Sequence, residues 1–286
     1  MHPDHSSNDN PYFIDTQSGA EMARLIMQDD TVTRNMGGPL SEPSDLSTIH
    51  DILDLACGPG SWVLDMAYAH PDKNVIGVDI DPTMVNYARA RARSQALDNN
   101  AHFQVMNATK QLDFPDNSFD LVNARLLVGF MRPENWPYLI QECRRVSRPG
   151  AILRLTESES AVTSGVAYNT LNTLLAQALH AAGQSFSPDG RHFGIVPRLG
   201  RLLRDAGYEH IQHKAYAVDF SAGTEAHEAI RQNSMAMLQL IQPFLIRMGV
   251  TTQEKVDELY QQAMVEMLSD DFCGIWFFLT VWGKNP

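Results

Sequence analysis

The sequence predicts an α/β fold with a mostly parallel sheet and helices on both of its faces. Apolar runs typical of buried strands alternate with helical patterns from residue 49 onward, as in successive βαβ units. The first run, 49–56, ends in the turn Gly58-Pro59-Gly60 and leads into an apolar helical pattern. The second run, 75–80, carries Asp79 near its end, where nucleotide-binding βαβ units place a ribose-binding carboxylate. These two runs hold most of the functional information in the sequence.

The other elements follow from turn and capping signals. Asp81 before Pro82 is an N-cap followed by proline at the first helical position, and Pro149-Gly150 turns the chain into a further strand. Seven strands are expected, at 50–56, 75–80, 101–106, 119–124, 151–156, 208–220 and 273–283. Helices are expected at 11–28, at 61–69, from 82 onward, and at 133–146, 167–182, 197–206 and 225–268, the last interrupted at Pro243 and Gly249.

We divide the chain into an N-terminal arm with a helix, residues 1–48, and one larger domain, residues 49–286. The segment of about 225–268 is interpreted as a helical insertion before the last strand, because strands flank it on both sides. It is rich in methionine, which suits an adaptable lining for an apolar ligand and equally suits core packing between helices. The methionines concerned are Met235, Met237, Met248, Met264 and Met267.

Composition narrows the classes of protein to consider. The 286 residues carry a formal net charge of -12, and no extended basic stretch offers a face for nucleic acid. The basic cluster Arg89, Arg91 and Arg93 is interpreted as a solvated helix face rather than a phosphate contact. Three widely spaced cysteines predict neither a disulfide framework nor a metal site. The polar N-terminus lacks an apolar signal core and no apolar run is long enough to span a bilayer, so a soluble, cytoplasmic protein is expected.

The glycine turn differs from a dinucleotide-binding fingerprint. That fingerprint requires a third small residue for close packing of helix on strand, and this chain has Val63 there. A nicotinamide-dependent dehydrogenase is therefore disfavoured. Asp54 adds a second signal, because a carboxylate inside a buried strand is costly unless it is hydrogen-bonded.

Four segments together resemble one family. Asp54-Leu55-Ala56-Cys57-Gly58-Pro59-Gly60 resembles the first motif of the class I S-adenosylmethionine-dependent methyltransferases, and Gly77-Val78-Asp79-Ile80-Asp81-Pro82 their acidic second motif. Asn107-Ala108-Thr109 with the following 114–120 is similar to the third motif, and 142–150 to the segment before strand five. The resemblance spans about 50–157 in the family's order and spacing. It implies a Rossmann-like sheet and S-adenosylmethionine as the cofactor, with S-adenosylhomocysteine as its product.

The resemblance also implies roles for individual residues. The glycine turn approaches the amino-acid end of the cofactor, Asp54 helps to hold its ammonium, and Asp79 accepts hydrogen bonds from both ribose hydroxyls. Asn107 meets the adenine edge at a position where many relatives have Asp, and Arg125 lies toward the methionine part. The full implied set is Asp54, Ala56, Cys57, Gly58, Gly60, Asp79, Ile80, Met84, Asn107, Ala108, Asn123 and Arg125.

Methyl transfer from a sulfonium is an in-line displacement that depends chiefly on alignment and exclusion of water. A general base is required only if the acceptor is a hydroxyl or an acidic carbon. Glu157 at the end of a strand and His192 are the predicted catalytic residues, with His180 and Tyr12 as further candidates. Family architecture makes the arm around Tyr12 and Phe13 a lid over the cofactor or the substrate.

The predicted function is methylation of a small metabolite on O, N or C, an apolar one if the methionine-rich insertion lines its site. Two alternatives stay open, a non-catalytic S-adenosylmethionine-binding protein and a protein methyltransferase. After strand four the chain reads Asn123-Ala124-Arg125-Leu126, unlike the Asn/Asp-Pro-Pro-aromatic motif of enzymes that methylate nucleobase amino groups. Neither a metal, a nucleic acid nor a membrane is expected as a partner, and a homodimer is compatible with the sequence.

Overall fold

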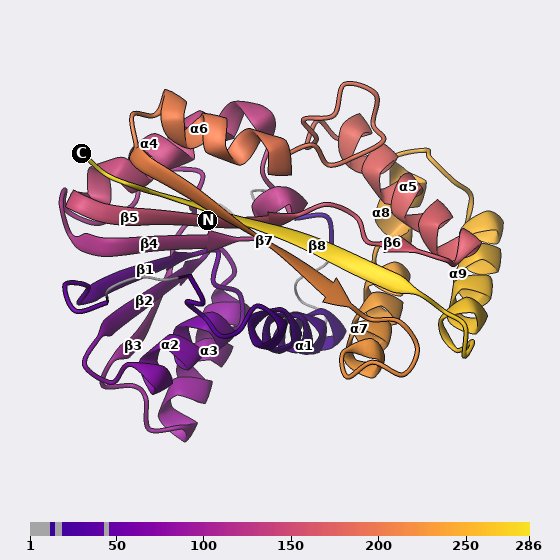
Figure 1. Cartoon of the computed structure of the whole chain (residues 1–286), viewed down its shortest axis with the longest axis horizontal. Coiled ribbons are helices and arrows are strands. Elements are labelled where there is room, and N and C mark those ends of the chain that lie inside the picture. The colour runs from indigo at the N-terminus through magenta and orange to yellow at the C-terminus, as the bar shows by residue number, and fades with distance from the viewer. Residues whose placement is uncertain (1–11, 15–18, 43–45) are drawn as a thin grey trace, which may run out of the picture.

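One eight-stranded sheet forms the centre of the computed structural model (Figure 1). The structure describes residues 12–14, 19–42 and 46–286, so the polar N-terminal arm up to residue 11 lies outside the described residues. Residues 12–14, expected to belong to the helix 11–28, are not helical. The strands are β1 Asp51–Leu55, β2 Asn74–Asp79, β3 Ala101–Val105, β4 Phe119–Arg125, β5 Ser147–Ser158, β6 Val162–Thr163, β7 Glu209–Asp219 and β8 Gly274–Lys284.

The sheet order confirms the predicted fold class. Neighbouring strands run β3-β2-β1-β4-β5-β8-β6, and β7 also pairs with β8. The strands from β3 to β5 are mutually parallel, whereas β8 is antiparallel to β5, β6 and β7. The sequence predicts seven of these strands; the additional one is β6, a two-residue strand too short to give a periodic signal.

Helices cover both faces of this sheet, and the alternation within strands explains why. In β1, Ile52 packs in one apolar core together with Trp62 and Val63, while Leu53 packs in the core on the opposite face together with Leu139. The helices α2 and α3 lie over one face, and α4 and α6 over the other (Figure 1). Their bounds are α2 Ser61–Ala69, α3 Pro82–Ser94, α4 Trp136–Val146 and α6 Leu199–Asp205.

A group of helices lies beyond one end of the sheet (Figure 1). Three of them, α7 His227–Leu240, α8 Gln242–Arg247 and α9 Gln253–Met267, form the segment between β7 and β8. A fourth, α5 Val166–Ala181, follows β6 and packs against α9. We call these four helices the cap. Within the described ranges, no helix is both long and apolar enough to cross a bilayer.

The N-terminal helix α1, Gly19–Asn35, connects the cap to the sheet, because it packs against both α7 and α2. It continues past Gln28, where the sequence predicts its end. The added turns contain Asp29, Asp30 and the β-branched run 31–33, a composition with low intrinsic helix preference. Tertiary contacts stabilise these added turns, since Val32 is almost fully buried.

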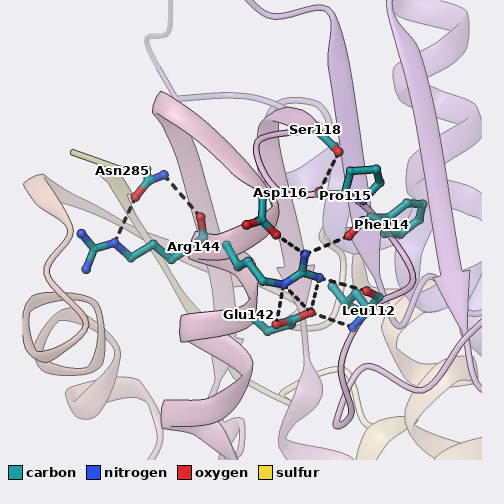
Figure 2. A network of polar contacts seen from close by, with 9 residues as sticks. Leu112, Phe114, Pro115, Asp116, Ser118, Glu142, Arg144 and Asn285 are labelled. Atoms are coloured by element: carbon teal, nitrogen blue, oxygen red, sulfur yellow. Dashed lines mark hydrogen bonds and ion pairs between the residues drawn. The ribbon is translucent and has the colours of Figure 1, made fainter.

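The segment similar to the family's strand-five motif fixes the loop before β4 (Figure 2). Arg145 donates to both oxygens of Glu142, to Asp116 and to the carbonyl oxygens of Leu112 and Phe114. Glu142 in turn accepts from the Leu112 amide at 2.7 Å. The guanidinium of Arg145 holds the pKa of Glu142 below its usual value. This network ties α4 to the chain that leads into β4, and β4 ends at the site.

Candidate functional site

A first pocket opens at the carboxyl ends of β1, β2 and β4, where ligands bind in open parallel sheets. Its floor comes from the turn after β1, from Asp79 and Ile80 after β2, and from the segment after β3. The helix α1 contributes Leu25, Gln28, Asp29 and Val32 to the opposite wall. The remaining lining residues are Tyr12, Asp54, Leu55, Ala56, Cys57, Gly58, Pro59, Ser61, Trp62, Met84, Met106, Asn107, Ala108, Thr109, Arg125, Leu126 and Phe130.

The two glycines of the turn serve different purposes. Gly58 has φ of 52° and lines the pocket, so its backbone is what a ligand meets. Gly60 has φ of 80°, and a Cβ there would lie 2.6 Å from the Phe103 ring and 2.8 Å from the Ala88 Cβ. Gly60 therefore allows β3 and α3 to pack against the turn. Arg91 fastens the same turn by donating to the Pro59 carbonyl at 3.0 Å, so this arginine is structural and not only solvated.

Asp79 is held rigidly at the end of β2. Its two carboxylate oxygens accept from the backbone amides of Gly58, at 2.8 Å, and Asp81, at 2.9 Å. Burial raises the pKa of Asp79, and these two amides partly offset the rise because they favour the ionised form. Each oxygen keeps further acceptor capacity, which faces the pocket.

Asp54 begins a buried polar chain that extends behind the pocket. Asn123 donates to Asp54 at 2.8 Å and accepts from Arg154 at 2.7 Å. Arg154 forms a two-pronged ion pair with Glu42, each N···O distance being 3.0 Å, and both side chains are 3% exposed. Tyr216 on β7 completes the chain by donating to Glu42 at 2.8 Å. Burial raises the pKa of Asp54 to about 7, although Asn123 and Arg154 act in the opposite direction.

Asn107 uses its carbonyl oxygen locally. That oxygen accepts from the amide and the hydroxyl of Thr109, at 2.9 and 2.7 Å, which forms a tight turn after β3. The side-chain amide nitrogen is then the group left to meet a ligand in the first pocket.

A second pocket adjoins the first and shares Tyr12, Gln28 and Leu126 with it. The cap lines one side of it: α5 contributes Tyr168, Asn172, Leu175 and Leu179, and α7 contributes Asn233, Ser234 and Met237. Tyr168 and Ser234 share a hydrogen bond of 3.1 Å between the two helices. The other lining residues are Phe13, Arg24, Val128, Gly129, Ser158, Glu159, Ser160, Ala161, Phe193 and Trp276.

Known proteins share this architecture and its motifs. A family model described as a methyltransferase domain matches residues 52–150, the stretch from β1 to the start of β5. This stretch is a methyltransferase domain of the class I S-adenosylmethionine-dependent type. The chain is 24% identical over 244 residues to methyltransferase pytC of Aspergillus terreus, covering 82% of this chain and 71% of that protein. It is also 24% identical to demethylmenaquinone methyltransferase of Geobacillus kaustophilus, over 59% of this chain and 75% of that protein.

A solved structure gives the same fold for this methyltransferase. Phosphoethanolamine N-methyltransferase 2 of Haemonchus contortus, in complex with S-adenosyl-L-methionine, matches with a TM-score of 0.54 at 17% identity, over 92% of this chain and 56% of that one. The predicted family and the predicted cofactor, S-adenosylmethionine, are thereby confirmed.

The described residues of the first pocket fit this cofactor. Its charged lining consists of Asp29, Asp54, Asp79 and Arg125, an acidic balance that suits a sulfonium cation. The two fixed carboxylate oxygens of Asp79 suit the hydroxyl groups of a ribose, which donate hydrogen bonds. Trp62, Met84 and Phe130 supply apolar surface. When bound there, S-adenosylmethionine would supply the electrophilic methyl group for transfer to an acceptor.

The pockets include most of the predicted cofactor residues. The exceptions are Gly60, which packs against Phe103, and Asn123, which lies one layer behind the lining and orients Asp54. Tyr12 and Phe13, predicted as a lid, line the second pocket, and Phe13 stacks on Phe244 of α8 with ring centroids 5.4 Å apart. Asp29 of the first pocket and Glu159 and Tyr168 of the second pocket were not predicted from the sequence. These residues come from separate segments, and no local sequence spacing connects them.

The predicted catalytic residues lie away from the pocket surfaces. Glu157 is fully buried and lines neither pocket; it accepts from the Leu127 amide at 2.6 Å. His192 and His180 are exposed and line neither pocket. These placements correct the expectation of a base at Glu157 or His192. The strand end does bring a carboxylate to the second pocket, but it belongs to Glu159, two residues further on.

Glu157 instead supports a strained turn. Ala56 and Leu126, at the ends of adjacent strands, are non-glycine residues with φ of 53° and 56°, and both line the first pocket. Such a left-handed backbone costs roughly 1–2 kcal/mol per residue. The hydrogen bond from the Leu127 amide to Glu157 holds the chain directly after Leu126, which is one of the residues that line both pockets.

We expect Glu157→Gln to make stability less dependent on pH. Burial raises the pKa of Glu157 to about 8, against about 4.5 for an unfolded chain, so folding favours the protonated form. The contribution of the protonated Glu157 carboxyl to stability is complete below its pKa in the unfolded chain. It is lost as pH rises toward its pKa in the folded protein. Between pH 5 and pH 6.5 the wild type should lose about 2 kcal/mol relative to the variant, or 1.4 kcal/mol per pH unit. Urea unfolding at several pH values measures this, and parallel curves for the two proteins would contradict it.

Proposed function

We propose that this methyltransferase transfers the methyl group of S-adenosylmethionine to a small, largely apolar metabolite bound in the second pocket. One observation carries the proposal: the second pocket adjoins the cofactor pocket and shares Tyr12, Gln28 and Leu126 with it. An acceptor held there would meet the cofactor at these three residues. Methyl transfer needs such a direct approach with water excluded.

The roles proposed for the cofactor residues follow from their positions. Asp79 would bind the two ribose hydroxyls, Ile80 and Met84 would pack on the adenine, and Asn107 would donate to an adenine nitrogen. Asp54 and Arg125 would hold the amino-acid end, and the backbone of Ala56, Cys57 and Gly58 would follow the cofactor. Pocket membership and the hydrogen bonds at Asp79 and Asn107 support these assignments.

The lining of the second pocket supports an apolar acceptor that carries a polar group. Phe13, Leu175, Phe193, Met237 and Trp276 give apolar and aromatic surface. Among the predicted methionines, Met237 lines this pocket, whereas Met235 and Met267 are buried in the core. Demethylmenaquinone, named for one relative, is an example of a mainly apolar acceptor.

The cap also favours a small acceptor over a protein substrate. The helices α5 and α7 both line the pocket, so an acceptor there would lie between helices, a common position for small-molecule sites. The test is incubation with methyl-labelled S-adenosylmethionine and fractionated cell extract, followed by separation of small molecules from protein. Label in the small-molecule fraction is expected. Label in protein would indicate a protein methyltransferase, and absence of transfer would indicate a non-catalytic binding protein.

We expect Met237→Trp to lower methylation of the acceptor at least about tenfold, because the indole fills the pocket that the acceptor needs. The dissociation constant for S-adenosylmethionine, measured by calorimetry, should change less than about twofold, since Met237 does not line the cofactor pocket. Met237→Leu, which keeps the volume, is the matched control and should retain activity. Full activity of Met237→Trp would place the acceptor elsewhere.

A further inference from the structure

The arginine at the end of β4 makes polar contacts that link helix α1 to the sheet. Arg125, at the end of β4, forms an ion pair with Oδ1 of Asp29 and donates to the Thr33 hydroxyl at 3.0 Å. The side chains of Arg125 and Asp29 are only 10% and 20% exposed. The pair therefore holds this helix over the first pocket at the end where Arg125 and Leu126 lie.

Asp29 has acceptor capacity that the protein leaves unused. Its Oδ2 atom is buried and has no hydrogen-bond partner among the described residues. A carboxylate oxygen buried in this way is costly unless a donor or a positive charge compensates it. Asp29 lines the cofactor pocket, so a ligand there can supply that compensation.

The charge around this atom suits a cation. The charged groups that line the pocket are three carboxylates, Asp29, Asp54 and Asp79, and the single guanidinium of Arg125. Asp79 belongs to β2 and is fastened to Gly58 and Asp81, while Asp29 faces the pocket from α1, beside Arg125 on β4. The two acids thus reach different parts of a bound cofactor. S-adenosylmethionine and S-adenosylhomocysteine share ribose, adenine and amino-acid groups, and differ by the methyl group and the positive charge on sulfur.

We propose that Asp29 is the residue by which α1 distinguishes the methyl donor from the demethylated product. Its unpaired oxygen would be attracted to the positive sulfur of a bound S-adenosylmethionine, so α1 would be held more firmly over the charged cofactor. After transfer, sulfur is neutral and this attraction is lost, which favours opening and release of the product. Asp29 acts here as a specificity-determining residue that needs no contact with the acceptor.

The test compares binding of the two ligands by calorimetry, without an acceptor. Asp29→Asn should lower the affinity for S-adenosylmethionine about tenfold and the affinity for S-adenosylhomocysteine less than about threefold. Sinefungin, which carries an amine in place of the sulfonium methyl, should follow S-adenosylmethionine. Asp30→Asn is the matched control, because Asp30 is the next acid on the same helix and pairs with Arg34 at the surface.

The outcomes separate this proposal from a general role in attaching the helix. Thr33→Val removes a contact to Arg125 without altering the charge, and it should lower the affinity for both ligands by the same factor. If Asp29→Asn also weakens both ligands equally, Asp29 only holds the helix or binds a group that both ligands share, and the proposal is wrong. Melting temperatures of the free variants establish that each one folds.

Discussion

Asp79→Ala is expected to lower the affinity for S-adenosylmethionine by about 100-fold. The carboxylate lies in the pocket with both oxygens fixed by the amides of Gly58 and Asp81, so it requires no reorganisation when a ligand binds. A hydrogen bond to a charged group contributes about 1.5–3 kcal/mol, and loss of two hydroxyl contacts corresponds to about 3 kcal/mol, or roughly two orders of magnitude. Calorimetric titration with S-adenosylmethionine measures the change.

Asp79→Asn should give an intermediate loss of about tenfold, because one carbonyl oxygen remains to accept a single hydroxyl. Asp98→Ala is a suitable control, since Asp98 is exposed in the turn after α3 and lines neither the cofactor pocket nor the second pocket. Its affinity should equal that of the wild type. An unchanged affinity in Asp79→Ala would exclude Asp79 from the ribose site, whatever the family motif implies.

The second large effect concerns stability. Glu42→Gln should lower the free energy of unfolding by about 3–5 kcal/mol, because it leaves the Arg154 guanidinium buried without its counter-charge. Both side chains are 3% exposed, so water cannot replace the lost partner. Burial opposes ionisation of Glu42, yet Arg154 more than compensates and lowers the pKa of Glu42. Urea unfolding near neutral pH, where the pair is fully charged, measures the loss.

The double variant Glu42→Gln with Arg154→Met isolates the cause. Removing both charges should recover most of the stability, because a buried pair replaced by neutral side chains costs far less than a broken pair. Asp30→Asn breaks the exposed pair with Arg34 and should change stability by no more than about 0.5 kcal/mol. A single variant Glu42→Gln within 1 kcal/mol of the wild type would show that the pair contributes little.

The sequence predicted the sheet because its strands carry strong periodic signals. Ile52 and Leu53 pack on opposite faces, and Asp81 caps α3 by accepting from the Thr83 amide at 2.7 Å. Such signals depend on neighbours in the chain. The end of α1 has no such signal, because Asp29 and Thr33 are fixed by Arg125, about 90 residues away in sequence.

The same reason explains which site residues could be predicted. The cofactor residues cluster in three short motifs at strand ends, and each motif has a recognisable local geometry. The acceptor pocket is assembled from Tyr12, Glu159, Tyr168 and Asn233, which belong to four separate segments. Glu157 is the predicted base because it directly follows the expected strand 151–156, at the carboxyl end where ligands bind in such sheets. The end of β5 reaches one residue beyond Glu157, and that extension buries Glu157 among strand neighbours.

The position of the segment α7–α9 has a consequence for how the choice of acceptor can diversify. The segment leaves the sheet at Asp219 and returns at Gly274, and these two ends are already joined by the bond from the Phe220 amide to the Gly274 carbonyl, at 2.9 Å. An insertion between two paired ends adds little loop-closure entropy, whatever its length. Exchange of α7–α9 therefore leaves the register of β7 on β8, and the motifs around Asp54 and Asp79, unaltered. Replacing this one continuous stretch would change the part of the acceptor pocket that Asn233, Ser234 and Met237 line, and would leave the other walls in place.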